Sequence, residues 1–216
     1  MARQALEADP AAIHALAGEG RVDLPEARLA AAGCRACDLW ARSTQTVFGS
    51  GPVPARWMLV GEQPGDREDV EGAPFVGPAG RILDEALAAA GIDRETTFAT
   101  NVVKHFKWRP APTGKRRLHE RPTRVEVSAC LPWVETELML VQPTTLVLLG
   151  ATAAQALLGP QVKVTRDHGR VASALAPEVI VTIHPSAILR ANGAQQREAA
   201  FAGLVGDLRL GTSARP

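Results

Sequence analysis

Four short runs of apolar residues constrain the fold of this chain more than any other feature of its sequence. A strand with one face in water alternates apolar and polar residues, whereas a strand buried on both faces is apolar throughout. The runs here are continuous, and each ends in polar or glycine-rich sequence. They therefore predict four strands of a parallel sheet covered on both faces, at residues 57–60, 98–103, 145–149 and 179–183.

Sequence typical of helices separates these runs. Most of the helical stretches end at a residue that stops a helix, such as Gly91, Pro143 or Gly159. Strands and helices that alternate with crossovers of this length predict an α/β fold, a three-layer α/β/α sandwich around a central four-stranded parallel sheet. The helical stretches are residues 78–90, 124–141, 151–158 and 195–210.

The length of 216 residues suits a single domain of that kind. We expect the alanine-rich residues 1–33 to form an N-terminal helical extension and residues 211–216 to be a frayed tail. With 46% hydrophobic and 22% charged residues, the composition is that of a soluble globular protein. No run approaches the ~18 apolar residues of a membrane span, and we expect no secretory leader after Met1. The expected location is therefore the cytoplasm, without membrane binding.

Charge is distributed unevenly along the chain. The net charge of +1 on its own argues against a nucleic-acid partner. Residues 104–124, however, hold eight basic side chains and one acid, so this segment carries +7 and the rest of the chain −6. A dense basic loop suits contact with DNA phosphates, and a solvated loop paired with the acidic residues 62–71 is the alternative. The eight basic residues are Lys104, Lys107, Arg109, Lys115, Arg116, Arg117, Arg121 and Arg124.

Polar groups follow the ends of the predicted strands. Residues 61–66, 101–105 and 184–186 carry amides, carboxylates or imidazoles, and residues 150–152 follow the run at 145–149. In open α/β sheets, ligands bind outside the carboxyl ends of the strands. The sequence therefore predicts a functional site at that edge of the sheet.

The three cysteines form a candidate metal site. Cys34 and Cys37 are separated by two residues, a spacing found in zinc sites, iron–sulfur clusters and redox disulfides. Three cysteines are too few for a secreted disulfide scaffold. The third is Cys130, and His105 is the best candidate by position for a fourth ligand. A zinc site of three cysteines and one histidine fits the same residues, and a buried inert thiol is the alternative for Cys130.

Several motifs in order resemble those of one family. Residues 62–65 (Glu-Gln-Pro-Gly) and the glycine-rich residues 72–80 are similar to the signature of the iron–sulfur, or family 4, uracil-DNA glycosylases. Residues 100–104 and 184–186 match the same family, and the match runs from about Cys34 to Leu210. The resemblance implies a uracil-DNA glycosylase-like fold and an enzyme that removes uracil from DNA.

Two departures from the ordinary family pattern indicate a subgroup. Position 105 is histidine where ordinary members have a cysteine ligand, and residues 115–119 (Lys-Arg-Arg-Leu-His) are an insertion. Together with Gln63, these features resemble UdgX, a subgroup that becomes covalently trapped on uracil-containing DNA. The resemblance implies a [4Fe–4S] cluster held by Cys34, Cys37, His105 and Cys130, and histidine is known as an iron ligand from Rieske centres.

The resemblance also assigns roles in uracil binding. Phe75 matches the residue that stacks on the flipped base, and Asn101 matches the residue that reads the uracil edge. His184 matches the histidine whose N–H faces uracil O2, where negative charge develops as the glycosidic bond breaks. A core phenylalanine at position 75 and a turn-stabilising amide at position 101 are the alternatives.

Residues of the first motif and the basic insertion complete the implied site. A tight turn at Pro64 and Gly65 is expected to direct main-chain N–H groups near Gln63 toward uracil. Asp66 and Asp69 are expected to fix the basic loop over the site by binding one of its arginines, with surface solvation as the alternative. Substrate contacts are expected from Gln63, Gly65 and Asp66. Loop positioning and DNA-backbone contacts are expected from Asp69, Lys115, Arg116, Arg117 and Arg190, with Arg116 or Arg117 as the partner of the aspartates.

His119 determines which activity we expect. It matches the nucleophile of the UdgX pattern, whose Nε2 attacks the sugar C1′ after uracil leaves. A neutral imidazole is a good nucleophile near pH 7, and Glu62 is expected to face the cationic sugar, orient the ring and accept its other proton. A loop histidine that contacts a phosphate is the alternative.

We therefore expect a protein that excises uracil from DNA and becomes covalently linked, through a histidine, to the abasic deoxyribose in a single turnover. A conventional multiple-turnover iron–sulfur uracil-DNA glycosylase and a non-catalytic iron–sulfur DNA-binding module are the alternatives. Glu62, Asn101 and His184 argue against the second, because a protein that binds only the DNA backbone needs none of them. The expected partner is uracil-containing DNA, mainly single-stranded, with no obligate protein partner and a monomeric protein.

Overall fold

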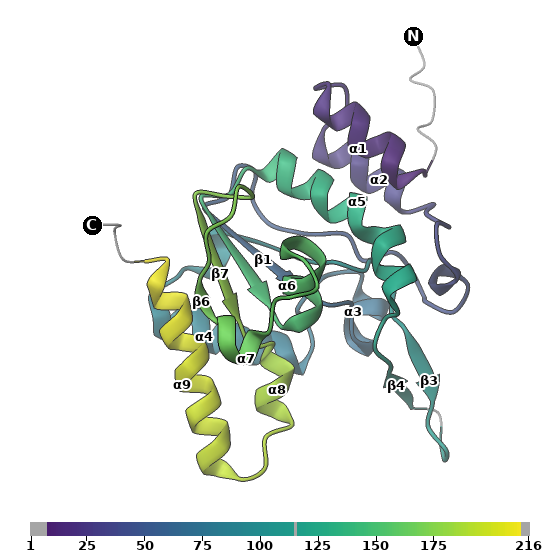
Figure 1. Ribbon diagram of the computed structural model, residues 1–216. Coiled ribbons are helices and arrows are strands. Elements are labelled where there is room, and N and C mark those ends of the chain that lie inside the picture. The colour runs from purple at the N-terminus through teal and green to yellow at the C-terminus, as the bar shows by residue number, and fades with distance from the viewer. Residues whose placement is uncertain (1–7, 115, 213–216) are drawn as a thin grey trace.

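The computed structural model describes residues 8–114 and 116–212, and a mostly parallel sheet lies at its centre (Figure 1). Every residue of its four parallel strands is buried, as the continuous apolar runs predict. A fifth strand, only two residues long, pairs antiparallel at the edge and was not predicted. The sheet order is β2 (Thr97–Asn101), β1 (Trp57–Gly61), β5 (Thr145–Leu149), β7 (Glu178–Thr182) and β6 (Gly169–Arg170).

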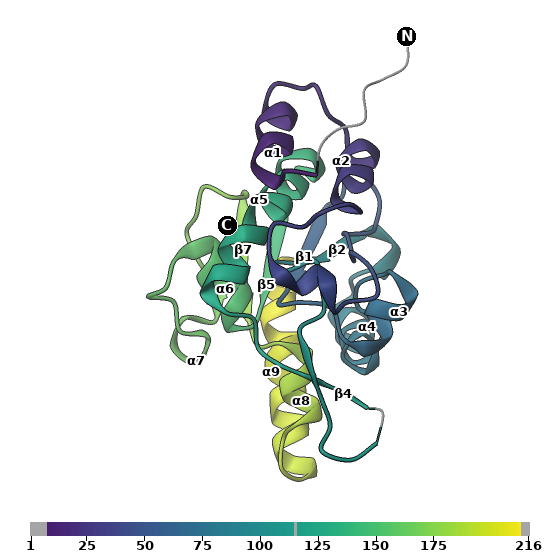
Figure 2. The same cartoon turned by 90° about the vertical axis from the view of Figure 1, so that its right-hand side faces the viewer.

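Side chains of the strands alternate between two hydrophobic clusters, one on each face of the sheet. Met58, Leu146 and Val181 pack into the cluster formed with α5 and α6. Leu59 and Val147 pack into the cluster formed with α4 and α9. Figures 1 and 2 show the resulting three layers, which confirm the predicted α/β/α sandwich. The main helices are α4 (Pro78–Ala90), α5 (Arg124–Val141), α6 (Ala151–Leu158), α8 (Pro185–Leu189) and α9 (Ala194–Leu210).

The predicted helix bounds agree closely with the structure, and local stop signals explain why. Helix α4 ends at Gly91, whose φ of 76° is left-handed and favours glycine. Helix α5 begins with a capping box in which Thr123 and Glu126 satisfy each other's main-chain N–H groups, and it ends at Gln142 just before Pro143. Strand β2 ends two residues earlier than predicted, because the chain leaves the ladder after Asn101.

Two helices precede the sheet, α1 (Pro10–Gly18) and α2 (Leu24–Ala31). Their buried residues Ile13 and Ala27 join the same hydrophobic cluster as Trp133 of α5. The described part of the expected N-terminal extension is therefore helical and packs on the domain. Of the tail expected to fray, residues 213–216 lie outside the described part of the chain.

The basic segment forms a β-hairpin instead of the loop that the sequence predicted. Strand β3 (Trp108–Pro110) pairs antiparallel with β4 (Arg117–His119), and Trp108 lies opposite His119. The hairpin extends away from the sheet (Figures 1 and 2). Strands of three residues that include a proline carry no apolar alternation, so the pattern gave no sign of them. The other short elements are η1 (Asp38–Ala41), α3 (Asp66–Glu71), η2 (Arg94–Thr96) and α7 (Val164–Asp167).

Across the part of the chain that the structure describes, none of the helices has the length and apolar character needed to cross a membrane.

Candidate active site

A cavity of about 350 Å³ lies at the carboxyl ends of the parallel strands. Side chains from the end of β1, the end of β4 and the start of α8 line it together, although they are far apart in sequence. The cavity therefore occupies the edge of the sheet that the sequence analysis selected. Its lining consists of Glu62, Gln63, His119, Arg121, Leu149, Gly150, Ala151, Thr152, His184, Ser186 and Arg190.

His119 faces Glu62 across this cavity. The His119 Nε2 lies 3.5 Å from the Glu62 Oε1, and about half of the His119 side chain (49%) is exposed. Burial lowers the pKa of the His119 imidazole, and the Glu62 carboxylate opposes this change. The ring is therefore neutral near pH 7, with a lone pair available on one nitrogen. We expected Glu62 to accept the proton of the His119 Nδ1. In the structure, the carboxylate instead lies near Nε2.

Glu62 is held by Thr152, which the sequence analysis missed, and by Arg121, which it counted only among the basic residues of segment 104–124. The Thr152 hydroxyl, from the first turn of α6, donates a hydrogen bond to the Glu62 Oε2. The Arg121 Nε lies 3.9 Å from the same oxygen. Thr152 follows β5 directly, so its place after a buried strand was the signal that could have identified it.

His184 is oriented by a chain of hydrogen bonds. The Ser186 main-chain N–H donates to the His184 Nδ1 at 3.1 Å, so a neutral ring carries its proton on Nε2. The Ser186 hydroxyl lies 2.8 Å from the same nitrogen and accepts a hydrogen bond from the Arg190 Nη1 at 2.9 Å. Burial, followed by repulsion from Arg190 and from the His119 ring when it is protonated, lowers the pKa of His184 to about 4. The site therefore contains a neutral imidazole with an N–H donor on Nε2, and Ser186 is a second residue that the sequence analysis missed.

Asn101 and Phe75 lie against the same point of β1. A Cβ added at Gly61 would lie 2.3 Å from the Asn101 Oδ1 and 2.7 Å from the Phe75 Cζ, so only glycine fits between these side chains. Both residues are buried, and the Phe75 ring stacks on the His184 ring with 6.1 Å between the centroids. The structure thus brings together three residues that we expected to bind the base.

The backbone at Phe75 is strained, and the glycine-rich motif accommodates it. Phe75 has a left-handed φ of 59°, which a non-glycine residue rarely adopts. A Cβ added at Gly80 would lie 1.6 Å from the Phe75 carbonyl oxygen, so glycine is required where the first turns of α4 pass this bend. Glycine at position 80 thus allows the bend at Phe75, whose ring stacks on His184.

Gln63 anchors the hairpin that carries His119. Its Oε1 accepts a hydrogen bond from the Lys107 N–H at 3.0 Å, and its Nε2 donates to the carbonyls of Lys107 and Glu120 at 3.2 and 3.0 Å. These bonds join the residues on both sides of the hairpin, so the side chain holds the hairpin. Because the Gln63 side chain is used in this way, only its main chain is left for the expected contact with uracil.

The acidic segment holds the hairpin from the other side. Arg117 of β4 donates hydrogen bonds to the carboxylates of Asp66 and Asp69, and its guanidinium also lies over the Phe106 and Trp108 rings. Asp69 is fully buried and also accepts hydrogen bonds from the Thr44 main chain and hydroxyl. Of Arg116 and Arg117, which we considered as the partner of the two aspartates, Arg117 is the one that binds them.

The other residues that we expected to contact DNA lie in different places. The Gly65 main-chain N–H donates to the Glu68 carboxylate and is the N-cap of α3, so it is already occupied. Arg116 is exposed beside the hairpin turn. Lys115 lies outside the described residues. Arg190 lies in the cavity lining, where it positions Ser186.

Three of the eight basic residues of segment 104–124 are paired with carboxylates inside the fold, so they are not free to contact phosphates. Lys104 is fully buried and its Nζ lies 2.6 Å from the Glu137 Oε2. Lys107 is paired with Glu126 at 3.0 Å, and Arg117 is paired with Asp66 and Asp69. Burial of these cations depends on partners distant in sequence, which a count of charges along the chain does not show. Among the basic residues of this segment that the structure describes, those that remain exposed are Arg109, Arg116, Arg121 and Arg124.

The three cysteines are free thiols that interact with one another. Cys34 and Cys130 are buried, and Cys37 is partly buried. Burial raises the pKa of Cys130 to about 12, with smaller contributions from Cys34 and Cys37. The Cys34 Sγ accepts a hydrogen bond from the Trp133 Nε1 at 3.3 Å, and the Cys130 Sγ accepts one from the Lys104 main-chain N–H at 3.2 Å. Donors aimed at sulfur stabilise thiolates, which are the ligands of iron–sulfur clusters.

His105 has the tautomer that a metal ligand requires. The Thr46 hydroxyl donates to the Ala31 carbonyl at 3.0 Å, so at its 2.9 Å contact with His105 it accepts a hydrogen bond from the Nε2–H. Burial lowers the pKa of His105 to about 4, so the ring is neutral and the Nδ1 lone pair is available. Metal-binding histidines commonly donate their second N–H in this way.

Within residues 8–114 and 116–212, no three His, Cys, Asp or Glu side chains converge on one point where a single metal ion could bind. In a [4Fe–4S] cluster each iron takes its own protein ligand, so the ligands surround the cluster and do not converge on a single ion. Three thiols and a neutral imidazole fit such a cluster chemically.

Comparisons with known proteins agree with this geometry. A family model described as the uracil DNA glycosylase superfamily matches residues 48–209. The chain is 38% identical over 159 residues to the type-4 uracil-DNA glycosylase of Thermotoga maritima, a match that covers 73% of this chain and 78% of that protein. It is 37% identical over 166 residues to the type-4 uracil-DNA glycosylase of Pyrobaculum aerophilum, covering 73% of this chain and 80% of that protein. The corresponding enzyme of Archaeoglobus fulgidus is 37% identical over 164 residues, covering 72% and 78%.

Proposed function

Because the chain belongs to the uracil DNA glycosylase superfamily and to its type-4 members, we propose that it excises uracil from DNA and then becomes covalently linked to the DNA through His119. The excision step rests on this membership. The covalent step rests on one observation, the 3.5 Å separation between the His119 Nε2 and the Glu62 Oε1 across the cavity.

In the first step the glycosidic bond between uracil N1 and the sugar C1′ breaks, and its electron pair leaves with uracil. Negative charge then develops on the uracil oxygens, where a neutral N–H donor strengthens its hydrogen bond. His184 supplies that donor through Nε2, since Ser186 occupies its Nδ1. Asn101 offers one donor and one acceptor, which suits uracil O4 and N3–H and disfavours cytosine, whose pattern is reversed.

In the second step the sugar carries positive charge at C1′. The Glu62 carboxylate stabilises this cation, and Thr152 holds the carboxylate in place. The lone pair on the His119 Nε2 forms a bond to C1′, which gives a charged imidazolium until the Nδ1 proton passes to solvent. The departing uracil anion takes a proton from water. No group remains to release the sugar from nitrogen, so each protein molecule reacts once.

A denaturing gel tests the covalent step. The wild-type protein is incubated with an excess of a single-stranded oligonucleotide that contains one uracil, and the mixture is boiled in detergent and separated by electrophoresis. We expect a protein–DNA band that survives boiling and released uracil in an amount equal to the protein that reacted. Free abasic DNA in excess over protein would instead support the multiple-turnover alternative. DNA that keeps its uracil would support the non-catalytic alternative.

We propose that Cys34, Cys37, His105 and Cys130 hold a [4Fe–4S] cluster, with His105 binding through Nδ1. Such a cluster flanks the hairpin, because His105 precedes β3 and Cys130 lies in α5 after β4. In this position it would fix the hairpin's flanks, with the residues of the cavity doing the chemistry.

Iron analysis tests the cluster. We expect about four irons per chain in anaerobically purified protein, with a broad visible absorption that is lost in Cys37→Ser. Thr46→Val should keep the thiolate ligands but lower the iron content, because it removes the acceptor that sets the His105 tautomer. A colourless protein with one zinc per chain would contradict the proposal.

A further inference from the structure

A second cavity opens directly beside the active-site cavity. It has a volume of about 530 Å³ and lies between the first half of α5 and helix α6. Arg121 and Thr152 line both cavities, so the two are adjacent. The lining consists of Arg121, Pro122, Arg124, Val127, Ser128, Leu131, Thr152, Gln155, Ala156 and Pro160. We call it the α5–α6 groove.

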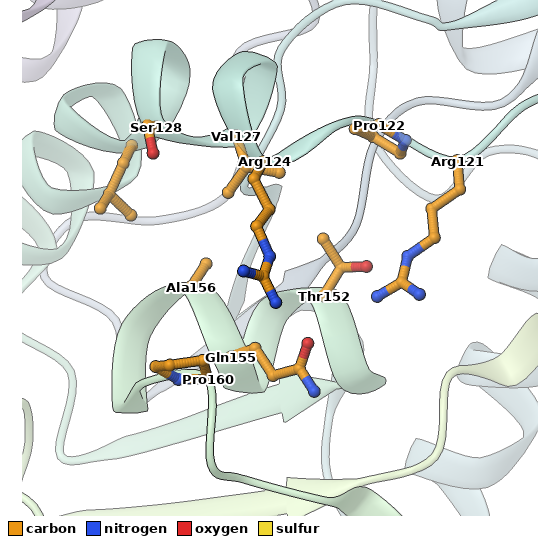
Figure 3. Close-up of a pocket in the computed structure, with 10 residues that line it drawn as sticks. Arg121, Pro122, Arg124, Val127, Ser128, Thr152, Gln155, Ala156 and Pro160 are labelled. Carbon is orange, nitrogen blue, oxygen red and sulfur yellow. The ribbon is translucent and has the colours of Figure 1, made fainter.

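The α5–α6 groove combines positive charge with an apolar floor. In Figure 3, the side chains of Arg121 and Arg124 extend from the segment that leads into α5 toward α6, where the Gln155 amide faces Arg124. Five of the lining residues are apolar, and we refer to them as the apolar floor: Pro122, Val127, Leu131, Ala156 and Pro160. None of the described residues that line the groove is acidic. This lining suits a ligand that carries negative charge next to a flat apolar group.

The two arginines are available for such a ligand. Lys104, Lys107 and Arg117 are occupied by carboxylates within the fold, so they do not add to the charge of the groove. The nearest carboxylate to Arg121 is the Glu62 Oε2 at 3.9 Å, which lies in the neighbouring cavity. Within the described residues, Arg124 has no carboxylate within ion-pair distance. Two of the exposed arginines of segment 104–124, Arg121 and Arg124, therefore lie at the groove.

We propose that the α5–α6 groove binds a nucleotide adjacent to uracil on the same DNA strand. Its phosphate lies between Arg121 and Arg124, and its base lies over the apolar floor within reach of Gln155 and Ser128. This inference rests on the proposed function, which places the uracil nucleotide in the adjoining cavity. Because Arg121 and Thr152 line both cavities, a strand that leaves the first cavity past these two residues reaches the groove. The volume lies within the range of small-ligand sites in proteins.

Single-turnover kinetics of uracil release test the inference. The substrates are short single-stranded oligonucleotides with one central uracil, in which each flanking phosphate is replaced in turn by a neutral methylphosphonate. With wild-type protein, one replacement should raise the half-saturating protein concentration by about three- to tenfold and leave the maximal rate unchanged. Arg124→Gln should raise this concentration by a similar factor for unmodified DNA and become insensitive to that one replacement.

The matched control is Arg21→Gln, which removes the same charge from an exposed arginine before α2. It should leave the half-saturating concentration unchanged and keep the sensitivity to every replacement. If the effects of Arg124→Gln and every methylphosphonate multiply independently, or if Arg124→Gln has no effect, the inference is wrong.

Binding of a strand without uracil separates this inference from the proposed function. Fluorescence anisotropy with a thymine-containing oligonucleotide should show weaker binding by Arg124→Gln, and the slope of log affinity against log salt should fall by about 0.7. If wild-type protein releases no uracil but Arg124→Gln shows this change, the function fails and the groove still binds DNA. If uracil is released normally and the salt slope is unchanged, the function stands and the groove inference fails.

Discussion

Replacing His119 with glycine is expected to abolish the covalent protein–DNA adduct while uracil is still released. The leaving-group contacts that we propose lie on His184 and Asn101, which belong to the start of α8 and the end of β2 and not to the hairpin. Glycine at position 119 leaves space for water beside Glu62, so water can take the sugar carbon in place of the imidazole. We expect uracil release within about tenfold of the wild-type rate, a change of about 1.4 kcal/mol in activation free energy.

The measurement follows adduct and free uracil in the same samples. Released uracil should exceed the amount of His119→Gly protein, because the variant is no longer consumed by each reaction. His168→Gly is the matched control, because His168 is an exposed histidine paired with Asp207 and lies outside the cavity lining. It should form adduct like the wild type. Loss of uracil release in His119→Gly would show that His119 takes part in the first step and would overturn the division of roles.

Replacing Lys104 with methionine is expected to lower the free energy of unfolding by about 3–5 kcal/mol. The Lys104 Nζ binds the Glu137 carboxylate at 2.6 Å, and both side chains are fully buried. The Glu137 carboxylate also accepts hydrogen bonds from the Gly49 N–H and the Thr100 hydroxyl, so it stays in place when its cation is removed. A buried carboxylate without its cation is strongly destabilising.

Urea denaturation of protein preparations with matched iron content measures the effect. The double variant Lys104→Met/Glu137→Leu should recover much of the loss, because it removes both charges together. Lys163→Met, on an exposed lysine, should change the free energy of unfolding by less than about 0.5 kcal/mol. If the single and double variants are equally unstable, then packing around Lys104, and not its charge, stabilises this region.

Lys104 also contacts a residue of the candidate site. The Lys104 Nζ donates to the Asn101 carbonyl at 2.7 Å, and Asn101 is the residue that we propose reads uracil. Lys104, which the sequence analysis counted among the basic residues suited to phosphate contact, therefore holds the main chain of Asn101. Its partner lies 33 positions away in α5, and a pattern of charges along the chain does not show such a pairing.

Residues whose role follows from local geometry could be predicted. Gly61 and Gly80 are required where backbone and side chains approach closely, and both lie in motifs that the sequence analysis singled out. His119, Glu62 and His184 were placed in one site because they follow strand ends or match a family motif, and the structure brings all three to one cavity. Residues that act only by supporting others, such as Thr152 and Ser186, carried no signal of their own beyond their position.

The sequence by itself determined the layers of the fold and the edge of the sheet where the site lies. Continuous apolar runs are stable only when both faces of a strand are covered, and glycine or capping residues end helices by local backbone preference. Only the tertiary structure decided which charges are buried in pairs, which remain exposed along the α5–α6 groove, and how Gln63 and Arg117 anchor the hairpin that carries His119. These outcomes depend on distances between residues far apart in the chain, because a charge is neutralised or left free by the partner that folding brings next to it.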